Sequence, residues 1–434
     1  MTQPLQFSIR SRSASCRARL GRVETLHGFF DTPAFMPVGT RGSVKGILPE
    51  LVRQTGAQIV LNNTFHLMLR PGSELIQKMG GVHRFMNWPG PILTDSGGYQ
   101  AYSLSESNCI DDDGVTFKSI IDGSMVRLTP ERAMQVQNEL GPDIMMAFDD
   151  CPPSAAIGDA EADASDKRLI GASARDKVEG KDDANSAQPT RKRSKSKGAL
   201  THQQRLEIAN ERTVKWLERC KAAHARPSEQ SLFGIVQGGT DLEMRSWCVE
   251  RICNIELPGY AIGGVAVGES PDAIAKVVRH TAPLMPEEKP RYLMGVGYER
   301  DLLIAVRSGV DMFDCVLPTR NGRNANAFTS RGQIRLKNAQ YQLDDGPIEE
   351  GCDCLACAPV KYGHVTPENQ PFTRSYLRHL FMAGEMLGPI LVSLHNLRHF
   401  QRFMADVRAT IVSGDWVGLV GRWPVVGDAS SFLQ

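Results

Sequence analysis

The sequence has no apolar run that approaches the roughly 20 residues of a membrane-spanning helix. Its N-terminal segment, MTQPLQFSIRSR, lacks the apolar core of a secretory signal peptide. A dense disulfide framework is also missing, because seven of the ten cysteines are scattered singly along the chain. These absences predict a cytoplasmic protein that has no membrane anchor.

An excess of charge of one sign is missing as well. The 434-residue chain has 50 basic and 49 acidic residues, so its formal net charge is +1. A protein that coats nucleic acid through bulk positive charge is therefore excluded, and any nucleic-acid site must be a local patch. Hydrophobic residues make up 41% of the chain, which is enough for a large core.

One internal segment, residues 156–199, has no aromatic side chain and is rich in Asp, Lys, Ser and Ala. Such a segment cannot bury enough apolar surface to offset the entropy of ordering its backbone. We expect a disordered insertion there. Its basic end, Arg191–Lys197, is either a contact to RNA phosphates or a solvated spacer with no specific role.

Eight short apolar runs without polar alternation are present, which is typical of strands buried on both faces. They are Ala34–Val38, Gln58–Asn62, Ile92–Asp95, Ile144–Asp149, Leu232–Gln237, Gly259–Gly264, Arg291–Gly295 and Met312–Val316. Helical patterns lie between many of them, at Pro49–Gly56, Thr129–Leu140, Gln203–Ala223, Leu242–Ile255, Pro271–Ala282 and Arg300–Ser308. This alternation predicts an α/β fold, a (β/α)8 TIM barrel, with a doubly wound open sheet as the alternative.

Flanking segments complete the expected organisation. Phe7–Thr25 reads as a β-hairpin with a turn at Gly21 that covers one end of the fold. We expect the barrel within residues 1–318, a separate subdomain at 319–400, and a C-terminal helical segment, 401–434, packed on the barrel.

Several of the predicted strands end in polar or small residues, namely Asp95, Asp149, Gln237, Gly264 and Asp314. In a barrel these ends gather on the face that carries the active site. An Asp at a strand end can also simply cap the next helix, but three carboxylates that converge on one rim indicate a site. Phe148 and the glycine pair Gly97-Gly98 suit a flat base, which needs an aromatic face, acceptors for its N–H groups and close backbone approach.

Three cysteines, Cys352, Cys354 and Cys357, lie within six residues. A single turn can aim all three thiols at one Zn2+ ion, which needs a fourth ligand. His364, His379, His395 and His399 are available downstream. Four protein ligands leave no open position, so the pattern predicts one structural rather than catalytic zinc ion.

A cationic strip follows directly after Asp314. Residues 319–340 contain five basic and no acidic side chains: Arg320, Arg323, Arg331, Arg335 and Lys337. Contact with RNA phosphates is a natural use of such a strip, and an ordinary solvated surface is the alternative.

Seven motifs, in this order along the chain, resemble those of the tRNA-guanine transglycosylase (queuine tRNA-ribosyltransferase) family. They are Asp95–Gln100, Phe148–Cys151, Gly234–Gly238, Tyr260–Glu269, Tyr292–Gly297, Asp311–Arg320 and the Cys352–Cys357 cluster with His395. The resemblance implies a (β/α)8 barrel with an inserted zinc-binding subdomain. It also implies exchange of guanine for a 7-deazaguanine base in the anticodon loop of tRNA, by a homodimer.

The resemblance further implies roles for individual residues. Asp314 matches the nucleophile, and Asp95 matches the acid that recognises the base and transfers protons. Base contacts are implied for Ser96, Asp149, Cys151, Gln237, Gly264, Val265, Val267 and Glu269. Tyr99 and Met294 match two plates between which the base stacks, and Cys352, Cys354, Cys357 and His395 match the zinc ligands.

Val267 and Cys151 resemble the bacterial pattern of the family. A valine side chain fills space that the bulky ring of queuine would need, so we expect 7-aminomethyl-7-deazaguanine as the incoming base and guanine of GUN anticodons as the outgoing one. Two departures from the family pattern are the insertion after Cys151 and a longer link between Cys357 and His395, with an extra segment at Ala358–Thr373.

Three other functions fit parts of the sequence. A non-catalytic, RNA-binding partner subunit of the same family would not need Asp314, Asp95 and Asp149 together. A barrel glycosidase acting on small sugars would not need the cysteine cluster or the cationic strip. A zinc-stabilised RNA-binding module would have no use for three rim carboxylates.

Overall fold

The computed structural model describes residues 4–103, 108–152, 200–363 and 370–427. The insertion expected at residues 156–199 lies outside these ranges. The central sheet consists of nine parallel segments: β4 (Ala34–Met36), β5 (Val38–Gly39), β6 (Val60–Asn62), β7 (Ile92–Thr94), β11 (Ile144–Met146), β12 (Ser231–Val236), β13 (Gly259–Ile262), β14 (Arg291–Leu293) and β15 (Met312–Asp314). Their hydrogen-bonded order is β4-β15-β14-β13-β12-β11-β7-β6-β5.

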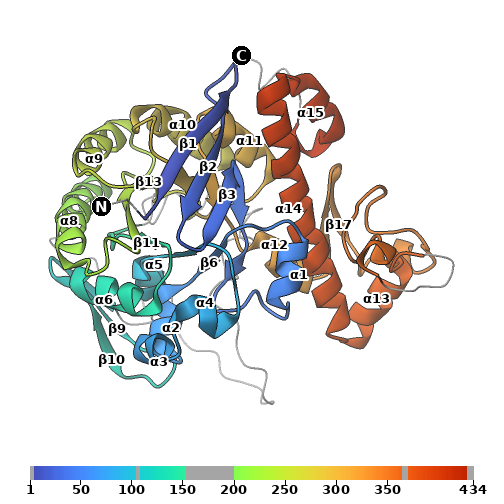
Figure 1. The fold of residues 1–434 in the computed structure, drawn as a ribbon, viewed down its shortest axis with the longest axis horizontal. Coiled ribbons are helices and arrows are strands. Elements are labelled where there is room, and N and C mark those ends of the chain that lie inside the picture. The colour runs from blue at the N-terminus through green and yellow to red at the C-terminus, as the bar shows by residue number, and fades with distance from the viewer. Residues whose placement is uncertain (1–3, 104–107, 153–199, 364–369, 428–434) are drawn as a thin grey trace.

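The first and last segments of this order, β4 and β5, are separated only by Pro37. Proline has no N–H to donate to the ladder, but its carbonyl still accepts a hydrogen bond from the Leu61 N–H at 2.9 Å. The two segments are therefore one interrupted strand, and eight strands close a parallel barrel. The predicted fold is confirmed (Figure 1), and the open doubly wound sheet is excluded.

The interior of the barrel is filled by apolar side chains from these strands, such as Met36, Leu61, Met146 and Ile235. An antiparallel sheet of β1 (Gln6–Arg12), β2 (Arg19–Thr25) and β3 (Gly28–Thr32) lies against one end (Figure 1). Val23 and Phe30 of this sheet belong to the same buried cluster, so the sheet closes that end of the barrel.

The turn predicted at Gly21 is wrong. Gly21 lies inside β2, where it pairs with Ile9 on one side and Thr32 on the other. A Cβ atom at this position would lie 2.6 Å from Cε2 of Phe7, so glycine is required for close packing rather than for a turn. The structure has a third antiparallel strand, β3, in addition to the two strands of the expected hairpin.

All six predicted helices are present: α1 (Pro49–Gln54), α6 (Pro130–Leu140), α8 (His202–Ala223), α9 (Leu242–Asn254), α10 (Pro271–Thr281) and α11 (Glu299–Arg307). Their starts follow from local chemistry, because Thr129, Thr201, Asp241 and Ser270 each accept a hydrogen bond from a first-turn N–H. Proline stands at the first turn of α1, α6 and α10.

Shorter elements decorate the barrel between β6 and α6. They are α2 (Thr64–Leu69), α3 (Ser73–Lys78), α4 (Gly81–Met86), α5 (Gly98–Ser103) and a sheet of β8 (Asn108–Asp111), β9 (Gly114–Lys118) and β10 (Met125–Leu128). A 3-10 turn, Ala282–Leu284, follows α10.

After β15 the chain forms a second body beside the barrel (Figure 1). It comprises α12 (Leu317–Arg323), β16 (Asn326–Thr329), β17 (Gly332–Arg335), two 3-10 turns (Ala339–Tyr341 and Pro359–Tyr362) and α13 (Arg374–Ala383). A separate apolar cluster that includes Ala327, Leu336, Ile348 and Leu377 fills its interior.

One long helix, α14 (Leu387–Ser413), joins the two bodies (Figure 1). It contacts α12, α13 and β16 of the second body, β4 and α11 of the barrel, and β2 of the sheet that closes the barrel. At 27 residues it is about 40 Å long. α14 is therefore continuous across residue 400, where we expected a boundary, and it packs at the eighth helix position of the barrel.

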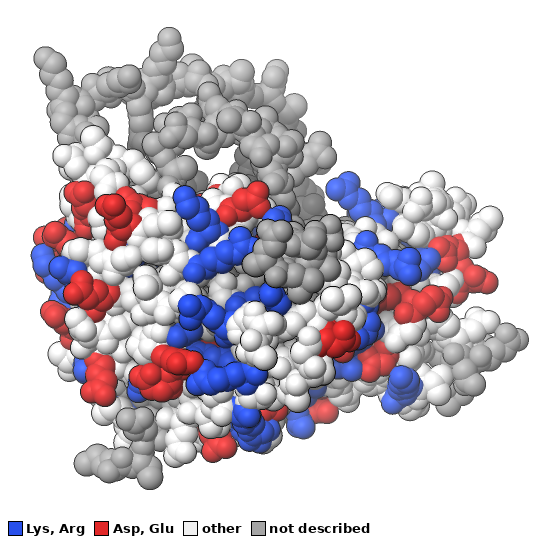
Figure 2. Space-filling view, turned by 90° about the horizontal axis from the view of Figure 1, so that it is seen from above, with Lys and Arg blue, Asp and Glu red and all other residues white. Residues whose placement is uncertain are grey.

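The chain then continues into α15 (Trp416–Arg422) and a 3-10 turn, Pro424–Val426. None of the described helices combines the length and the apolarity that a bilayer crossing requires. The surface is mixed in charge. Figure 2 shows basic side chains gathered in the middle of one face and acidic ones mostly toward its edges, so the net charge of +1 conceals local patches.

Candidate active site and metal centre

The carboxyl ends of the barrel strands form one rim. Asp95 follows β7, Asp149 lies three residues after β11, and Asp314 is the last residue of β15. Gln237 and Gly264 follow β12 and β13 at the same end. The rim expected from the sequence is therefore formed, at the end of the barrel where (β/α)8 enzymes carry their active sites.

Asp314 is held through one oxygen. Its Oδ1 accepts hydrogen bonds from the Tyr292 hydroxyl at 2.5 Å and from the Gly295 N–H at 2.8 Å. Among the described residues, Oδ2 has no hydrogen-bond partner. Burial raises the pKa of Asp314, and the donors on Tyr292 and Gly295 oppose that rise. The carboxylate is thus fixed in position with one oxygen available for reaction.

Tyr292 was missed in the sequence because it stands inside an apolar strand. β14 and β15 are parallel neighbours in which Tyr292 pairs with Met312, so the tyrosine side chain points to the interior and its hydroxyl reaches Asp314, two residues further along β15. A buried tyrosine in such a run reads only as a core residue. Its hydroxyl becomes informative once the register is known.

Asp95 is buried and hydrogen-bonded from the neighbouring strand end. Its Oδ2 accepts from the Asn63 amide at 2.5 Å, and its Oδ1 accepts from the Thr64 N–H at 2.8 Å. Burial raises the pKa of Asp95 to about 7, with the Thr64 N–H opposing the rise and the nearby Asp314 charge adding to it. Asp95 can therefore both give and take a proton near neutral pH.

Asp149, Gln237 and Ser96 form one cluster. Asp149 accepts from the Gln237 amide at 2.6 Å and from the Ser96 hydroxyl at 3.2 Å. Burial raises the pKa of Asp149 to about 6, while Gln237 and Ser96 oppose that rise. Among the described residues, the buried Oε1 atom of Gln237 has no partner, so it can accept a hydrogen bond from a ligand.

The backbone after β13 is shaped around this amide. Gly264 has a φ of +61°, and a Cβ atom there would lie 2.1 Å from the Gln237 Oε1 atom. Ala266 also has a positive φ of 62°, which is strained for a residue with a side chain. Glu269 accepts from the Val267 N–H at 2.8 Å and so fixes the turn.

Arg245 of α9 supports the same backbone from behind and was missed in the sequence. Its guanidinium is fully buried and donates to four carbonyl oxygens, those of Val236 at 3.0 Å, Gly239 at 2.9 Å, Gly263 at 2.7 Å and Gly264 at 3.0 Å. Burial lowers the pKa of Arg245 to about 10. On an amphipathic helix, an arginine at this position gives no sequence signal of a buried role.

The remaining predicted base contacts also lie around the rim. Tyr99 is exposed on α5, after β7, and Met294 is half-buried after β14, so these two approach from opposite sides of the barrel. The Val265 side chain is buried in the core, which leaves its backbone for any ligand contact. Cys151 is half-buried, and burial raises the pKa of its thiol.

Asp150 is not part of the site. Its two oxygens accept from Arg205 and Arg212 of α8, each at 2.6 Å. These two ion pairs tie the start of α8 to the end of β11 beside Asp149.

The cationic strip runs from the rim into the second body. Arg320 and Arg323 belong to α12, and Arg335 belongs to β17. Arg331, Arg335 and Lys337 are exposed, and none of them has an ion pair with an acidic side chain in the described ranges. Phosphate groups can therefore approach these three cations.

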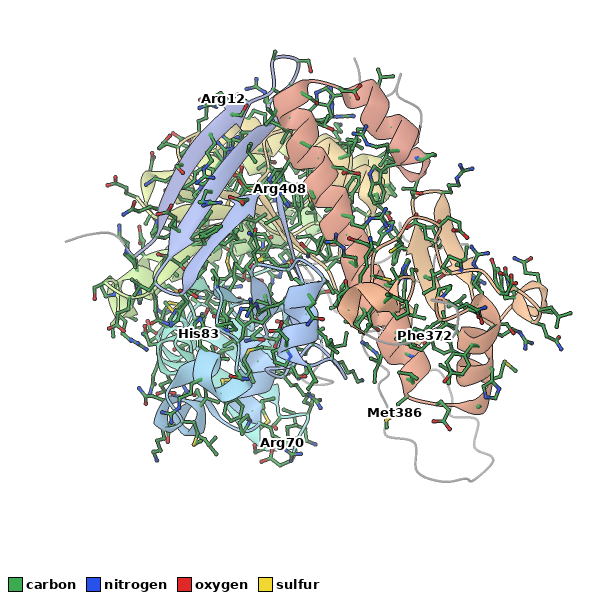
Figure 3. The ribbon with its side chains drawn as sticks, turned by 45° about the vertical axis from the view of Figure 1, so that its right-hand side comes forward. Arg12, Arg70, His83, Phe372, Met386 and Arg408 are labelled. Carbon is green, nitrogen blue, oxygen red and sulfur yellow. The ribbon has the colours of Figure 1, made fainter. Side chains whose placement is uncertain are left out.

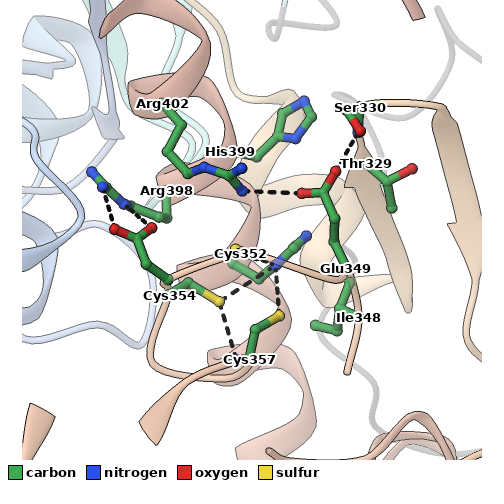
Figure 4. Close-up of polar contacts among 12 residues, drawn as sticks. Thr329, Ser330, Ile348, Glu349, Cys352, Cys354, Cys357, Arg398, His399 and Arg402 are labelled. Atoms are coloured by element: carbon green, nitrogen blue, oxygen red, sulfur yellow. Dashed lines mark hydrogen bonds and ion pairs between the residues drawn. The ribbon is translucent and has the colours of Figure 1, made fainter. Parts of the chain in front are cut away.

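The cysteine cluster lies in the second body (Figure 4). The Nδ1 atom of His395 is 3.6, 3.4 and 3.5 Å from the sulfurs of Cys352, Cys354 and Cys357. A tetrahedral ion with bonds of about 2.3 Å to sulfur and about 2.0 Å to nitrogen would make this S···N separation about 3.5 Å. The four residues thus fit a metal ion, and His395 is the histidine that completes the set.

Contacts around the cluster orient its ligands. The Nε2 atom of His395 donates to the Phe328 carbonyl at 2.7 Å, which leaves Nδ1 facing the sulfurs. Arg398, one helical turn along α14, pairs through two nitrogens with Asp353 at 2.7 and 2.6 Å (Figure 4). His379 and His399 do not belong to this cluster of ligands, and His364 is outside the described residues.

The sequence matches the family described as Queuine tRNA-ribosyltransferase over residues 14–170 and 196–423. This chain belongs to the queuine tRNA-ribosyltransferase family. The resemblance inferred from the motifs is thereby confirmed. The family match skips residues 171–195, inside the segment that we expected to be an insertion.

Relatives with the name queuine tRNA-ribosyltransferase align over nearly the whole chain. The protein of Synechococcus elongatus is 44% identical over 96% of this chain and 94% of its own length. That of a Thermus thermophilus strain is 44% identical over 95% and 91%, and that of Idiomarina loihiensis is 45% identical over 92% and 92%. The queuine tRNA-ribosyltransferase assignment therefore covers both the barrel and the second body.

Proposed function

We propose that this protein is a tRNA-guanine transglycosylase that replaces guanine at the wobble position of GUN-anticodon tRNAs with 7-aminomethyl-7-deazaguanine, a step of queuosine biosynthesis. The observation that carries the proposal is the pair of rim acids. Asp314 is anchored through one oxygen by Tyr292 and Gly295, and Asp95 is a buried acid with a pKa of about 7.

The reaction is a double displacement. An Asp314 oxygen attacks C1′ of the ribose, the bond to guanine breaks, and its electron pair leaves with the base. Protonated Asp95 gives its proton to the departing guanine. The incoming base then loses a proton to the Asp95 carboxylate and attacks C1′, which releases Asp314 and restores the original configuration.

Base recognition falls to the cluster between β7 and β13. Asp149 and the Gln237 Oε1 atom accept from the amine and amide edge of the base, with Ser96, Cys151 and the backbone of Gly264 and Val265 beside them. Tyr99 and Met294 cover the two faces of the base. Val267 limits the size of the 7-substituent, and Glu269 shapes the backbone that receives its ammonium group.

The tRNA contacts belong to the cationic strip, Arg320, Arg323, Arg331, Arg335 and Lys337. The exposure of Arg331, Arg335 and Lys337 without acidic partners in the described ranges supports this role. The reacting base must leave its stack, which costs less in an anticodon loop than in a duplex. We also propose that the cysteine cluster holds one zinc ion, whose four ligands leave no position for substrate, so its role is to hold the second body together.

A homodimer fits the surface of the second body. Phe372, Tyr376 and His379 form a stacked row with centroid separations of 6.2 and 6.4 Å. Tyr376, Met382 and Met386 are exposed, and Figure 3 shows Met386 at the lower edge of this body. Exposed apolar groups of this kind favour an interface between subunits.

Base exchange on a tRNA with a GUN anticodon tests the proposal. Asp314→Asn should abolish incorporation of labelled guanine and of the aminomethyl base while tRNA binding persists. Asp31→Asn, on the sheet at the opposite end of the barrel, is the matched control and should exchange normally. If the unaltered protein binds tRNA but exchanges no base, it is instead a non-catalytic partner subunit.

A further inference from the structure

A second group of potential metal ligands lies at the opposite end of the barrel from the rim. His27 is in the turn between β2 and β3, His83 is in α4, and Asp143 precedes β11. The His27 Nδ1 atom is 2.9 Å from Asp143 Oδ1, and the His83 Nε2 atom is 2.9 Å from Asp143 Oδ2. One ligand atom from each residue lies within 4.8 Å of the other two. No step of the proposed base exchange uses these residues.

The charge of Asp143 has little compensation from protein groups. Its side chain is 1% exposed and accepts one backbone hydrogen bond, from the Ile92 N–H at 2.9 Å. Within the described residues, no lysine or arginine pairs with it. The buried carboxylate therefore relies on the two imidazoles, and a buried anion needs a cationic partner or several donors to remain ionised.

The two imidazoles are poorly suited to supply that charge together. Their rings are stacked with centroids 3.6 Å apart and an interplanar angle of 16°. If both rings were protonated, two positive charges would face each other at this separation, and one carboxylate compensates only one of them. The two rings can therefore supply at most one positive charge without this repulsion, whereas a single divalent cation between the three ligands supplies two positive charges while each ring binds as neutral imidazole.

The donor geometry suits such a cation. Two ligands at about 2.1 Å from one six-coordinate ion and at right angles to each other are about 3 Å apart, close to both of the N···O separations of 2.9 Å. The His27 side chain is 44% exposed, so water can reach the cluster and fill the remaining coordination positions. A donor set of imidazole with one carboxylate binds divalent ions of the later transition series in preference to Mg2+ or Ca2+.

We propose that His27, His83 and Asp143 form a second metal site that takes a divalent transition-metal ion, with Zn2+ as the ion to test. On binding, the proton on the ligating nitrogen of each neutral ring moves to its other nitrogen, so the rings need not lose a proton to solvent. The ion links the turn of the N-terminal sheet to α4 and to the start of β11. Figure 3 shows His83 on the barrel side of the molecule, away from Phe372 and the second body.

The test is zinc binding by equilibrium dialysis at buffered free Zn2+, with the metal measured by mass spectrometry. The full-length protein should bind one equivalent more than His27→Ala and one more than His27→Asn. The asparagine variant matters because its side chain can still donate to Asp143 but is a poor ligand. His280→Ala, which removes a half-buried histidine hydrogen-bonded to Ser246, is the matched control and should bind as much as the unaltered protein.

Thermal unfolding supplies the second readout. Added Zn2+ should raise the unfolding temperature of the unaltered protein and of His280→Ala by more than that of either His27 variant. Equal zinc contents of the unaltered protein and the His27 variants would overturn the proposal, and so would an asparagine variant that keeps the extra equivalent. Because the result is a difference between variants, it does not depend on what the cysteine cluster binds or on base exchange.

Discussion

Replacement of Tyr292 by phenylalanine isolates the hydrogen bond that anchors Asp314. The hydroxyl donates to Oδ1 at 2.5 Å and holds the pKa of Asp314 down, whereas Gly295 still donates after the change. A hydrogen bond to a charged group contributes about 1.5–3 kcal/mol. At about 1.36 kcal/mol per pKa unit, its loss should raise the pKa of Asp314 by about one to two units.

The sign of the effect on activity follows from the reaction. In the proposed reaction Asp314 must be ionised to attack, so a higher pKa of Asp314 should move the acid limb of the exchange rate to higher pH. At pH values below the pKa of Asp314 in the unaltered enzyme, the Tyr292→Phe enzyme should exchange guanine about 10 to 100 times more slowly than the unaltered enzyme. The difference in rate should shrink toward pH 8.5, as the pH rises above the pKa of Asp314 in both enzymes.

The assay is the initial rate of labelled guanine incorporation into tRNA between pH 5.5 and 8.5. Tyr260→Phe is the matched control, because its hydroxyl donates to the backbone carbonyls of Cys253 and Ile255 and not to a rim carboxylate. That variant should leave the acid limb in place. An acid limb that does not move in Tyr292→Phe would refute the anchoring role of Tyr292.

Cys352→Ser should lose the bound metal, and elemental analysis with thermal unfolding should show less zinc and lower stability; an unchanged zinc content contradicts the ligand assignment. Val267→Gly should accept queuine, and competition between queuine and 7-aminomethyl-7-deazaguanine measures this. Unchanged selectivity would contradict the steric argument. Arg245→Met removes the side-chain donor of four carbonyls, of which that of Val236 keeps the Gly263 N–H, and should cost several kcal/mol in urea unfolding. Asp95→Asn should stabilise the protein at pH 8 by up to about 4 kcal/mol, because a folded-state pKa of about 7 means that the ionised acid is disfavoured above neutrality. This difference in unfolding free energy should shrink as the pH falls through 7 toward about 4, because the acid is then protonated in the folded protein and largely in the unfolded protein. A difference that does not change with pH would argue against the raised pKa of Asp95.

The barrel could be predicted from the sequence because its strands are buried on both faces. Runs such as Ile144–Met146 and Ser231–Val236 contain no exposed residue, so they lack alternation and are separated by helices with clear caps. The first strand could be predicted in spite of Pro37, because the residues on both sides of this proline are apolar. The three rim acids were also predictable, because strand ends in a parallel barrel share one face.

The partners of those acids could not be predicted. Asn63 caps the short helix α2 through its side-chain oxygen, and its amide nitrogen donates to Asp95. Tyr292 reads as core, and Arg245 reads as the polar face of α9. The contacts of Tyr292 and Asn63 join residues that are 22 and 32 positions apart, and those of Arg245 join residues 6 to 19 positions apart, so strand register and helix packing decide them. The separate roles of Asp314 and Asp95 came from the family resemblance.

The structure adds a physical reason for that division of roles. Asp314 receives a hydroxyl and an N–H on one oxygen, and these donors oppose the effect of burial on its pKa. The pKa of Asp95 is raised by burial and, in addition, by the charges of both Asp314 and Asp149. A pKa of about 7 favours a proton on Asp95 near neutral pH, and the negative charge of Asp314 adds to that preference. The different surroundings of the two acids therefore suit the roles proposed for them, nucleophile for Asp314 and proton donor for Asp95.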